Sequence, residues 1–273
     1  MIDLHNHIIY KFDDGPRSLQ ESLDMLKIAR DQGIQDVFAT SHFNEIIPPD
    51  VENDYFNKLN ILREKVDAGN LNITIHQGSE LFYHLFLDKT IKKSAVATLA
   101  GLGKYVLIEF SLFIMPTGVK DVLFKLSLED VTPIIAHPER YSGVIDRPEL
   151  VLEYIHHGAL LQVNAGSILG DFGKEIQKIS MWMFENKLVH FIGSDAHGIK
   201  GRRTFKLHEA VEELLYHFDK QYIIPLVTKN PRKIIDSEKI EKSEIPLHLL
   251  EENGFFSKLK KKFSFSKKDD FPF

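Results

Sequence analysis

The sequence contains no cysteine. This absence excludes a disulfide scaffold, a thiolate zinc site and a cysteine nucleophile, including the paired cysteine and arginine on which many phosphatases depend. Any metal ion must therefore be bound through nitrogen and oxygen ligands. The chain has 13 histidines and 39 Asp and Glu residues, so donors of both kinds are abundant.

Long apolar runs are also missing. No uninterrupted apolar stretch reaches the ~20 residues that a membrane-spanning helix needs. The start of the chain lacks the basic region and apolar run of a secretory signal. These features predict a cytoplasmic location.

Positive charge is scarce except near the end of the chain. The net charge is −5, but residues 257–273 carry six Lys and two Asp, which leaves −9 on the rest. An acidic body argues against nonspecific binding of nucleic acid. The basic, Phe-containing segment predicts at most a weak contact with a membrane surface or an anionic partner, and a solvated tail is the preferred interpretation.

No linker rich in Pro, Gly or Ser interrupts the chain. With 273 residues, of which 43% are hydrophobic, the chain can bury a substantial core. Because α/β barrels of ~200–250 residues commonly fold as one unit, we expect one domain over residues 1–250. Residues 251–273 are then expected to form a flexible tail.

The stretch DLHNHIIYKFDDG at residues 3–15 contains the first concentration of metal-binding side chains. His5 and His7 are two residues apart in a segment with the pattern of a strand. Their imidazoles therefore point to the same side and can reach one point. This is the geometry of metal ligands, and Asp14 follows shortly afterwards.

One local pattern recurs along the chain: an amphipathic helix, a Gly or Asn stop, a short apolar run and then polar residues. The clearest copy is SLQESLDMLKIARDQGIQDVFATSH at residues 18–42. Ser18 and Glu21 form a capping box, and Gly33 suits the end of the helix. Apolar runs separated by helical patterns predict parallel strands with helical crossovers. Together with the opening strand, the copies give seven strands.

Candidate metal ligands follow the apolar run in successive copies of this pattern. In parallel α/β barrels the carboxyl ends of the strands form the active site, so these side chains are expected to converge. Chance would distribute His, Asp and Glu among loops and helix faces as well, and we therefore interpret the set as a polynuclear metal site. The set comprises His5, His7, Asp14, His42, Glu80, Glu109, His137, Asp195 and His197.

Other polar residues receive structural interpretations. His84 is expected to be a polar loop residue, and Glu139 is expected to make a structural hydrogen bond. His156 and His157 lie at a predicted helix end, where positive charge interacts favourably with the helix dipole. The remaining histidines, to which no role is assigned, are His76, His190, His208, His217 and His248.

Seven motifs occur in order: HNH at 5–7, FDDG at 12–15, TSH at 40–42, GSEL at 78–81, IEF at 108–110, AHPER at 136–140 and GSDAH at 193–197. This series resembles the PHP (polymerase and histidinol phosphatase) superfamily. The order and spacing most resemble the bacterial manganese-dependent tyrosine phosphatases of the CpsB/YwqE type, which regulate capsule and exopolysaccharide synthesis. The resemblance spans residues 1–235 and includes NPRKII at 230–235.

The resemblance implies a distorted (β/α)7 TIM-like barrel of the PHP type with three divalent metal ions. It implies that the substrate is a phosphotyrosine protein, the tail of a bacterial tyrosine kinase. By position, the first ion would be held by His5, His7, Glu80 and Asp195. Glu80 would bridge to a second ion held by Glu109 and His137, and the third would be held by Asp14, His42 and His197.

The donor set determines which chemistry is available. Imidazole and carboxylate ligands suit Mn²⁺, Fe²⁺ or Zn²⁺, and the many carboxylates together with the resemblance favour Mn²⁺. Two ions ~3.5–4 Å apart would activate a bridging hydroxide as the nucleophile for phosphomonoester hydrolysis. Arg140 and Arg202 are predicted to bind phosphate, with Arg203 as the competitor of Arg202.

Three other functions are compatible with parts of this pattern. A small-molecule phosphatase such as histidinol phosphatase would share the metal site, and a deeper, closed pocket would favour it. Exonuclease action on phosphodiesters is disfavoured by the acidic body. A scaffold that binds phosphotyrosine without hydrolysis is disfavoured because no predicted ligand is missing.

Overall fold

The computed structural model of the chain describes residues 1–44 and 46–252. Neighbouring strands in this part of the chain pair in parallel, as expected for apolar runs separated by helices. The strands are β1 (Ile2–Asn6), β2 (Asp36–Ala39), β3 (His42–Phe43), β4 (Thr74–Gln77), β5 (Glu80–Phe82), β6 (Tyr105–Glu109), β7 (Thr132–Ala136), β8 (Leu160–Asn164) and β9 (Phe191–Gly193).

The strands form two sheets, with the orders β1-β2-β4 and β3-β5-β6-β7-β8-β9. The chain passes from the first sheet to the second twice, between β2 and β3 and between β4 and β5. The segment after β9 also meets β1, because Asp195 N–H donates to the His5 carbonyl at 2.7 Å and His7 N–H donates to the Ala196 carbonyl at 2.8 Å. The predicted parallel α/β class is confirmed. Closure of the sheets into one seven-stranded barrel stays a prediction.

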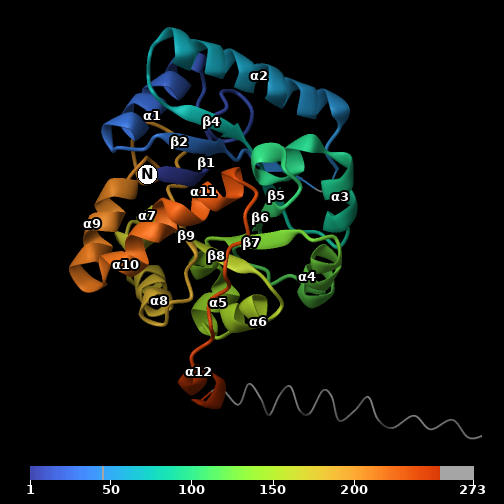
Figure 1. Ribbon diagram of the computed structural model, residues 1–273, viewed down its shortest axis with the longest axis vertical. Coiled ribbons are helices and arrows are strands. Elements are labelled where there is room, and N and C mark those ends of the chain that lie inside the picture. Colours follow the sequence, from blue (N-terminus) through green and yellow to red (C-terminus); the bar gives the residue numbers. More distant parts are fainter. Residues whose placement is uncertain (45, 253–273) are drawn as a thin grey trace, which may run out of the picture. The chain divides into compact units, whose positions relative to one another are not determined.

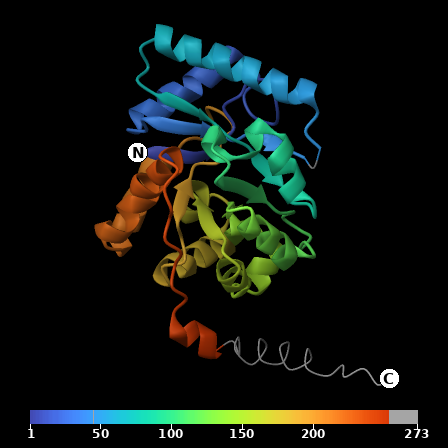
Figure 2. The same ribbon diagram turned by 45° about the vertical axis from the view of Figure 1, so that its right-hand side comes forward.

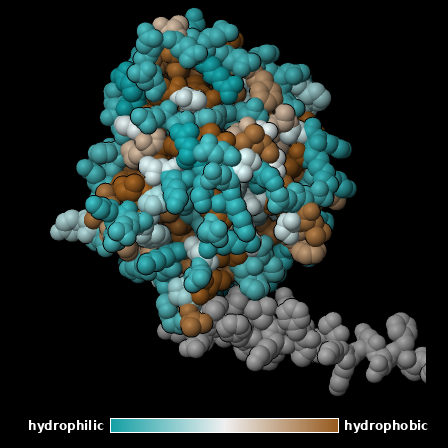
Figure 3. Space-filling view, in the orientation of Figure 1, coloured by the Kyte–Doolittle hydropathy of each residue, from teal (hydrophilic) through white to brown (hydrophobic). Residues whose placement is uncertain are grey.

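Most of the helices lie on the outside of the strands in both ribbon views (Figures 1 and 2). The face in Figure 3 is largely hydrophilic, with apolar residues in small, scattered groups. The α-helices that accompany these strands are α1 (Leu19–Asp31), α2 (Pro49–Ala68), α3 (Leu87–Lys93), α4 (Val119–Leu128), α5 (Ser142–Asp146), α6 (Leu150–His156), α7 (Ala165–Ile168), α8 (Lys174–Glu185), α9 (Leu207–His217), α10 (Lys220–Ile223) and α11 (Lys229–Ile235). The 3-10 helices are η1 (Ala95–Ala97), η2 (Leu99–Gly101), η3 (Pro138–Arg140) and η4 (Ile224–Val227).

Helix α1 begins and ends where its sequence predicts. Ser18 Oγ accepts a hydrogen bond from Glu21 N–H at 3.1 Å, and Gly33 follows the helix with φ of 78°. The Glu21 carboxylate accepts from Arg17 N–H at 2.8 Å, one residue before the cap. The capping box is therefore present in a shifted form, and it fixes the start of the helix that returns the chain to β2.

An apolar cluster fills the space among the strands. Ile2 of β1, Phe38 of β2, Leu107 of β6 and Phe191 of β9 belong to this cluster, together with Ile234 of α11. Helix α11 contacts β1 and lies in front of the strands in Figure 1. Because the apolar side chains are fully or almost fully buried, they hold the strands in register, and the polar residues at the carboxyl ends lie on a fixed frame.

The chain divides into two units, of which the first is Met1–Ser243. The second begins at Glu244, and its described part contains α12 (Leu247–Glu252). The predicted boundary at residue 250 stays a prediction, and the basic segment 257–273 lies outside the described residues. Among the helices of residues 1–44 and 46–252, none has the length and apolar composition that crossing a bilayer requires.

Buried His190 has a protonation state that is tied to folding. Its ring is 3% exposed, and Leu161 N–H donates to Nδ1 at 3.1 Å. Ser243 N–H donates to Nε2 at 3.0 Å, so backbone N–H groups face both ring nitrogens. Protonation of Nδ1 would place two donors against each other, and burial lowers the pKa of His190 to about 3.

This arrangement predicts a pH-dependent stability. The unfolded chain binds a proton at His190 below about pH 6.5, whereas the folded chain does so only near pH 3. The contribution of neutral His190 to the free energy of unfolding is therefore complete above pH 6.5 and is lost as the pH falls toward 3. Between pH 7.5 and 4.5, we expect the free energy of unfolding to fall by about 2–3 kcal/mol more in the wild type than in His190→Asn. Urea titrations at both pH values measure this difference, and parallel pH profiles for the two proteins would contradict it.

Candidate metal centre

The nine predicted ligands come together in one cluster. They lie in β1 and the loop after it, at the first residues of β3 and β5, at the last residue of β6, and in the segments after β7 and β9. Each contacts at least one other member of the set at 3.7 Å or less. His42 and Glu80 come three residues after the carboxyl ends of β2 and β4, so the shared position agrees with a parallel arrangement in which the carboxyl ends of the strands face the same way.

Glu80 lies at the centre of the group and is 1% exposed. Its Oε1 lies 3.3 Å from His5 Nε2 and 3.0 Å from His137 Nε2. Its Oε2 lies 3.3 Å from His7 Nε2 and 3.0 Å from His42 Nδ1. One carboxylate thus contacts four imidazoles from three separate segments of the chain, which is the position expected of a residue that bridges two metal ions.

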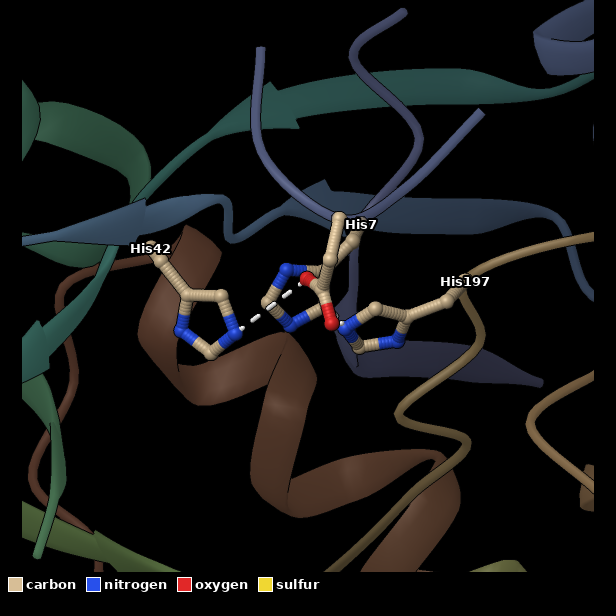
Figure 4. A group of neighbouring side chains, drawn as sticks. His7, His42 and His197 are labelled. Carbon is tan, nitrogen blue, oxygen red and sulfur yellow. Dashed lines mark ion pairs between the residues drawn. The ribbon is translucent and has the colours of Figure 1, made fainter. Parts of the chain in front are cut away.

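A second carboxylate, Asp14, contacts two imidazoles on the more open side of the cluster. Its Oδ1 lies 3.4 Å from His42 Nε2 and 3.0 Å from His197 Nε2. The His7 and His197 rings stack with centroids 3.8 Å apart. In Figure 4 the imidazoles of His7, His42 and His197 lie close together, and the dashed lines mark the ion pairs.

Asp195 and Glu109 complete the set from opposite sides. Asp195 Oδ1 lies 3.7 Å from Nε2 of both His5 and His7. Glu109 lies 3.6 Å from His137 Nε2 and 3.5 Å from His42 Nδ1 through its two oxygens. Each of these carboxylates therefore lies between two imidazoles of the cluster.

This donor set fits divalent cations. Among the described residues, three groups of donors can each hold an ion, because the ligand atoms inside each group lie within 4.8 Å of one another. The groups are His7, Asp14, His42 and His197; His5, His7 and Glu80; and His42, Glu80 and Glu109. Buried Glu80 Oε2 and His137 Nδ1 make no hydrogen bond within the described part of the chain, and a metal ion would satisfy such atoms. The groups share His7, His42 and Glu80, so the division of the donors among three ions stays a prediction.

Burial and mutual charge shift pKa values in the cluster in both directions. Burial alone would lower the pKa of His5, but the Glu80 carboxylate more than offsets this effect and the pKa rises to about 9. Burial, reinforced by the charge of Glu80, raises the pKa of Glu109 to about 7. Burial lowers the pKa of His137 to about 4. Bound cations would favour ionised carboxylates and neutral imidazoles, which are the ligand forms.

Two arginines reach the cluster. Arg140 Nη1 donates to Asp195 Oδ2 at 2.8 Å, and its guanidinium lies 4.5 Å from the centre of the Phe172 ring. Arg203 Nη1 donates to Asp14 Oδ2 and Nη2 donates to Asp195 Oδ1, each at 3.0 Å. Arg203 Nη2 also contacts His197 Nε2. Both guanidinium groups are therefore within reach of an anion at the centre.

The structure places Arg203, and not Arg202, beside the cluster, and the phosphate-binding role of either arginine stays a prediction. The side chain of Arg202 is exposed, whereas Arg203 makes the contacts with Asp14 and Asp195. The reason is a backbone hydrogen bond, in which His197 N–H donates to the Arg203 carbonyl at 2.9 Å and so fixes Arg203 beside the cluster. Sequence spacing alone does not distinguish adjacent arginines in an irregular loop.

Residues absent from the predicted set orient two of the histidines. His5 Nδ1 lies 2.9 Å from Gln162 Oε1, and His7 Nδ1 lies 2.9 Å from Asp13 Oδ2. Asp13 also accepts from His42 N–H at 3.0 Å. With Nδ1–H donating to these oxygens, Nε2 of each ring is free to bind a metal. Two features of the sequence could have indicated these roles: Asp13 is adjacent to the predicted ligand Asp14, and Gln162 lies within a largely apolar strand.

Two structural interpretations agree with the contacts. Glu139 is buried, and its Oε1 accepts from Asn164 N–H at 3.0 Å, which is the structural hydrogen bond expected of it. Burial raises the pKa of Glu139 to about 7. His84 Nδ1 accepts from Phe86 N–H at 3.2 Å in the loop before α3, as expected of a polar loop residue.

The family of the chain follows from its sequence. The sequence model of the family described as "Capsular polysaccharide synthesis, CpsB/CapC" matches residues 1–236. The chain belongs to the CpsB/CapC family. This membership confirms the resemblance inferred from the seven motifs.

Relatives in the CpsB/CapC family match nearly the whole chain. CapC of Staphylococcus aureus is 33% identical over 264 residues, which cover 95% of this chain and 100% of the relative. Tyrosine-protein phosphatase CpsB of Streptococcus agalactiae is 32% identical over 248 residues, which cover 88% of this chain and 100% of the relative. Tyrosine-protein phosphatase YwqE of Bacillus subtilis is 32% identical over 248 residues, which cover 88% of this chain and 93% of the relative.

Solved structures support the same relationship. A chain from the crystal structures of YwqE from Bacillus subtilis and CpsB from Streptococcus pneumoniae, described as metal-dependent tyrosine phosphatases, matches with a TM-score of 0.82 at 28% identity. The match covers 90% of this chain and 98% of that chain. A phosphotriesterase homology protein from Escherichia coli matches with a TM-score of 0.55 at 11% identity, and the match covers 85% of this chain and 97% of that chain. This second likeness concerns the fold alone.

Proposed function

We propose that this protein is a metal-dependent phosphomonoester hydrolase that removes phosphate from tyrosine. The observation that carries the proposal is the contact of Glu80 with imidazoles from several strands. It occurs in a chain whose relatives are named tyrosine-protein phosphatases. The names of the relatives support a phosphotyrosine protein as the substrate, and the family description supports a substrate that acts in capsular polysaccharide synthesis. A bacterial tyrosine kinase fits this role.

The metal ions of this proposal would be held by the donors of the cluster. Mixed imidazole and carboxylate ligands without thiolate suit Mn²⁺, Fe²⁺ or Zn²⁺, and the many carboxylates together with the family resemblance favour Mn²⁺. Three ions are proposed, in accordance with the overlapping groups of donor atoms. The proposed ligands are His5, His7, Asp14, His42, Glu80, Glu109, His137, Asp195 and His197.

The arginines would act on the phosphate itself. Divalent ions would supply Lewis acidity and an activated water nucleophile. Arg140 and Arg203 would exchange their bonds to Asp195 and Asp14 for bonds to phosphate oxygens. Their forked donors would bind the transition state more strongly than the ground state if they are positioned for its flattened, equatorial oxygens. A phenolate leaving group, whose conjugate acid has a pKa of ~10, needs no strong general acid.

Exposure within the cluster favours a protein substrate over a small metabolite. The side chains of Asp14 and His42 are 53% and 34% exposed, whereas those of His5, His7 and Glu80 are fully buried. The centre is therefore open on the Asp14–His42 side. A phosphotyrosine projecting from a protein could reach it there, and the small-molecule alternative would be better served by an enclosed pocket.

We also infer that the two sheets close into the distorted (β/α)7 barrel that the sequence predicts. The hydrogen bonds of His5 and His7 to the segment after β9 support this inference, because they join the first strand to the last. The cytoplasmic location stays a prediction.

Hydrolysis of four substrates tests the proposed function. Protein loaded with Mn²⁺ should hydrolyse p-nitrophenyl phosphate and a phosphotyrosine peptide. A matched phosphoserine peptide should react about tenfold more slowly or worse, since an alkoxide is a poorer leaving group than a phenolate of pKa ~10. Release of inorganic phosphate is the measurement. Equal rates on the two peptides, or a strong preference for histidinol phosphate, would overturn the tyrosine assignment. Binding of phosphotyrosine without phosphate release would favour the scaffold alternative.

A further inference from the structure

The open side of the metal centre leads onto a hollow surface. A hollow of about 650 Å³ is lined by His42 together with Phe12, Phe43 and Asp50. His42 connects this hollow to Glu80, because its Nδ1 lies 3.0 Å from Glu80 Oε2. A substrate segment that presents phosphate to the cluster from this side must therefore lie along these walls.

A second pocket adjoins the first and shares Ile46 with it. This pocket, of about 310 Å³, is lined by Ile46, Ile47 and Phe86 and by the lysines Lys89 and Lys93. Ile46 is 78% exposed and Phe86 is 48% exposed. Apolar side chains with this exposure, beside a site that is proposed to act on proteins, are typical of a recognition surface.

The charges around this pocket favour an acidic occupant. Lys92, on the same helix α3, pairs with Glu129 at 2.7 Å, away from the pocket lining. Lys89 and Lys93 are one helical turn apart and both are exposed, so they share one face and repel each other. A carboxylate placed between them would relieve this repulsion. The neighbouring carboxylate of Glu52 accepts hydrogen bonds from Ser94 Oγ at 2.6 Å and Val96 N–H at 3.0 Å.

We propose that the pocket formed by Ile46, Phe86, Lys89 and Lys93 binds an apolar residue and an adjacent acidic residue that flank the phosphotyrosine of the substrate. This proposal rests on the proposed function and adds a sequence preference to it. The apolar side chain would pack on Ile46 and Phe86, and the carboxylate would lie between the two lysines. The shared residue Ile46 makes the pocket continuous with the hollow beside His42.

Phosphopeptides with a movable Leu-Glu pair test the proposal. The pair is placed at successive positions on either side of phosphotyrosine, and each peptide is compared with its Leu-Lys counterpart by kcat/KM. At the position that places the pair in the pocket, we expect kcat/KM to be about threefold to tenfold higher for the Leu-Glu peptide than for the Leu-Lys peptide. Lys93→Glu should abolish or invert this preference, and Lys93→Gln should weaken it. Phe86→Ala should remove the advantage of Leu over Ala in the peptide.

A small substrate and a charge control make the outcomes distinguishable. Lys178→Glu reverses an exposed lysine on α8, which contributes nothing to the pocket lining, and should leave the peptide preference unchanged. Hydrolysis of p-nitrophenyl phosphate should be the same in every variant, because this substrate has no flanking residues. Failure of the wild type on p-nitrophenyl phosphate would reject the proposed function itself.

Three results would reject the pocket while the function stands. The first is a Leu-Glu preference that is the same in the wild type and in Lys93→Glu. The second is a change in sedimentation mass in Lys93→Glu with an unchanged peptide preference, which would assign the surface to contacts between copies of the chain. The third is loss of binding to phosphatidylglycerol vesicles with an unchanged peptide preference, which would assign it to a lipid surface.

Discussion

Replacing Glu80 by Ala is expected to abolish turnover and to lower the content of bound metal. Glu80 is buried and contacts His5, His7, His42 and His137, so no neighbouring carboxylate can take over all of its contacts. Loss of a bridging ligand removes the activated nucleophile as well as a ligand, and we expect turnover to fall about 1000-fold or more. Phosphate release and metal analysis of the dialysed protein measure the two effects.

The neutral variant Glu80→Gln separates charge from volume. It keeps the shape of the side chain, so the surrounding imidazoles need not collapse into a cavity, but it provides no carboxylate for a cation. We expect the same loss of metal and activity as in Glu80→Ala, with an unchanged far-UV circular dichroism spectrum. His84→Ala is the control, since His84 bonds within its own loop and should change turnover little. Near-normal turnover of Glu80→Gln would remove the basis of the polynuclear site.

Replacing Arg203 by Ala is expected to cost far more activity than replacing its neighbour Arg202. Arg203 contacts Asp14, Asp195 and His197, whereas the Arg202 side chain is exposed. If Arg203 binds the developing charge on phosphate, its loss should lower kcat/KM by about 30-fold to 1000-fold, equivalent to about 2–4 kcal/mol. The loss should be apparent in kcat as well as in KM, since the contact strengthens in the transition state.

Two further variants make the arginine result specific. Arg203→Lys keeps the charge but loses the fork of donors, and it should recover only part of the activity. Arg202→Ala should remain within about threefold of the wild type, as expected for an exposed side chain. Metal content should be unchanged in all of these proteins. An Arg202→Ala defect as large as that of Arg203→Ala would restore the assignment made from sequence spacing.

The local sequence was sufficient for the elements that frame the site. Ser18 and Gly33 mark the ends of α1 because capping and left-handed backbone are properties of single residues. Apolar runs between helical patterns predicted parallel strands, since strands buried on both faces must be apolar. The positions of His42, Glu80 and Glu109 at or near strand ends then followed from the common direction of the strands.

The convergence of the nine donors could be predicted from the sequence, because segments that follow parallel strands emerge at the same edge. The position of Arg203 rather than Arg202 beside them could not be predicted, since a backbone hydrogen bond between His197 and Arg203 in the folded chain sets the path of the loop. The tertiary structure also decided which oxygens orient His5 and His7, because Gln162 and Asp13 approach these rings only in the folded chain. Such contacts depend on the relative positions of distant segments, which no local pattern encodes.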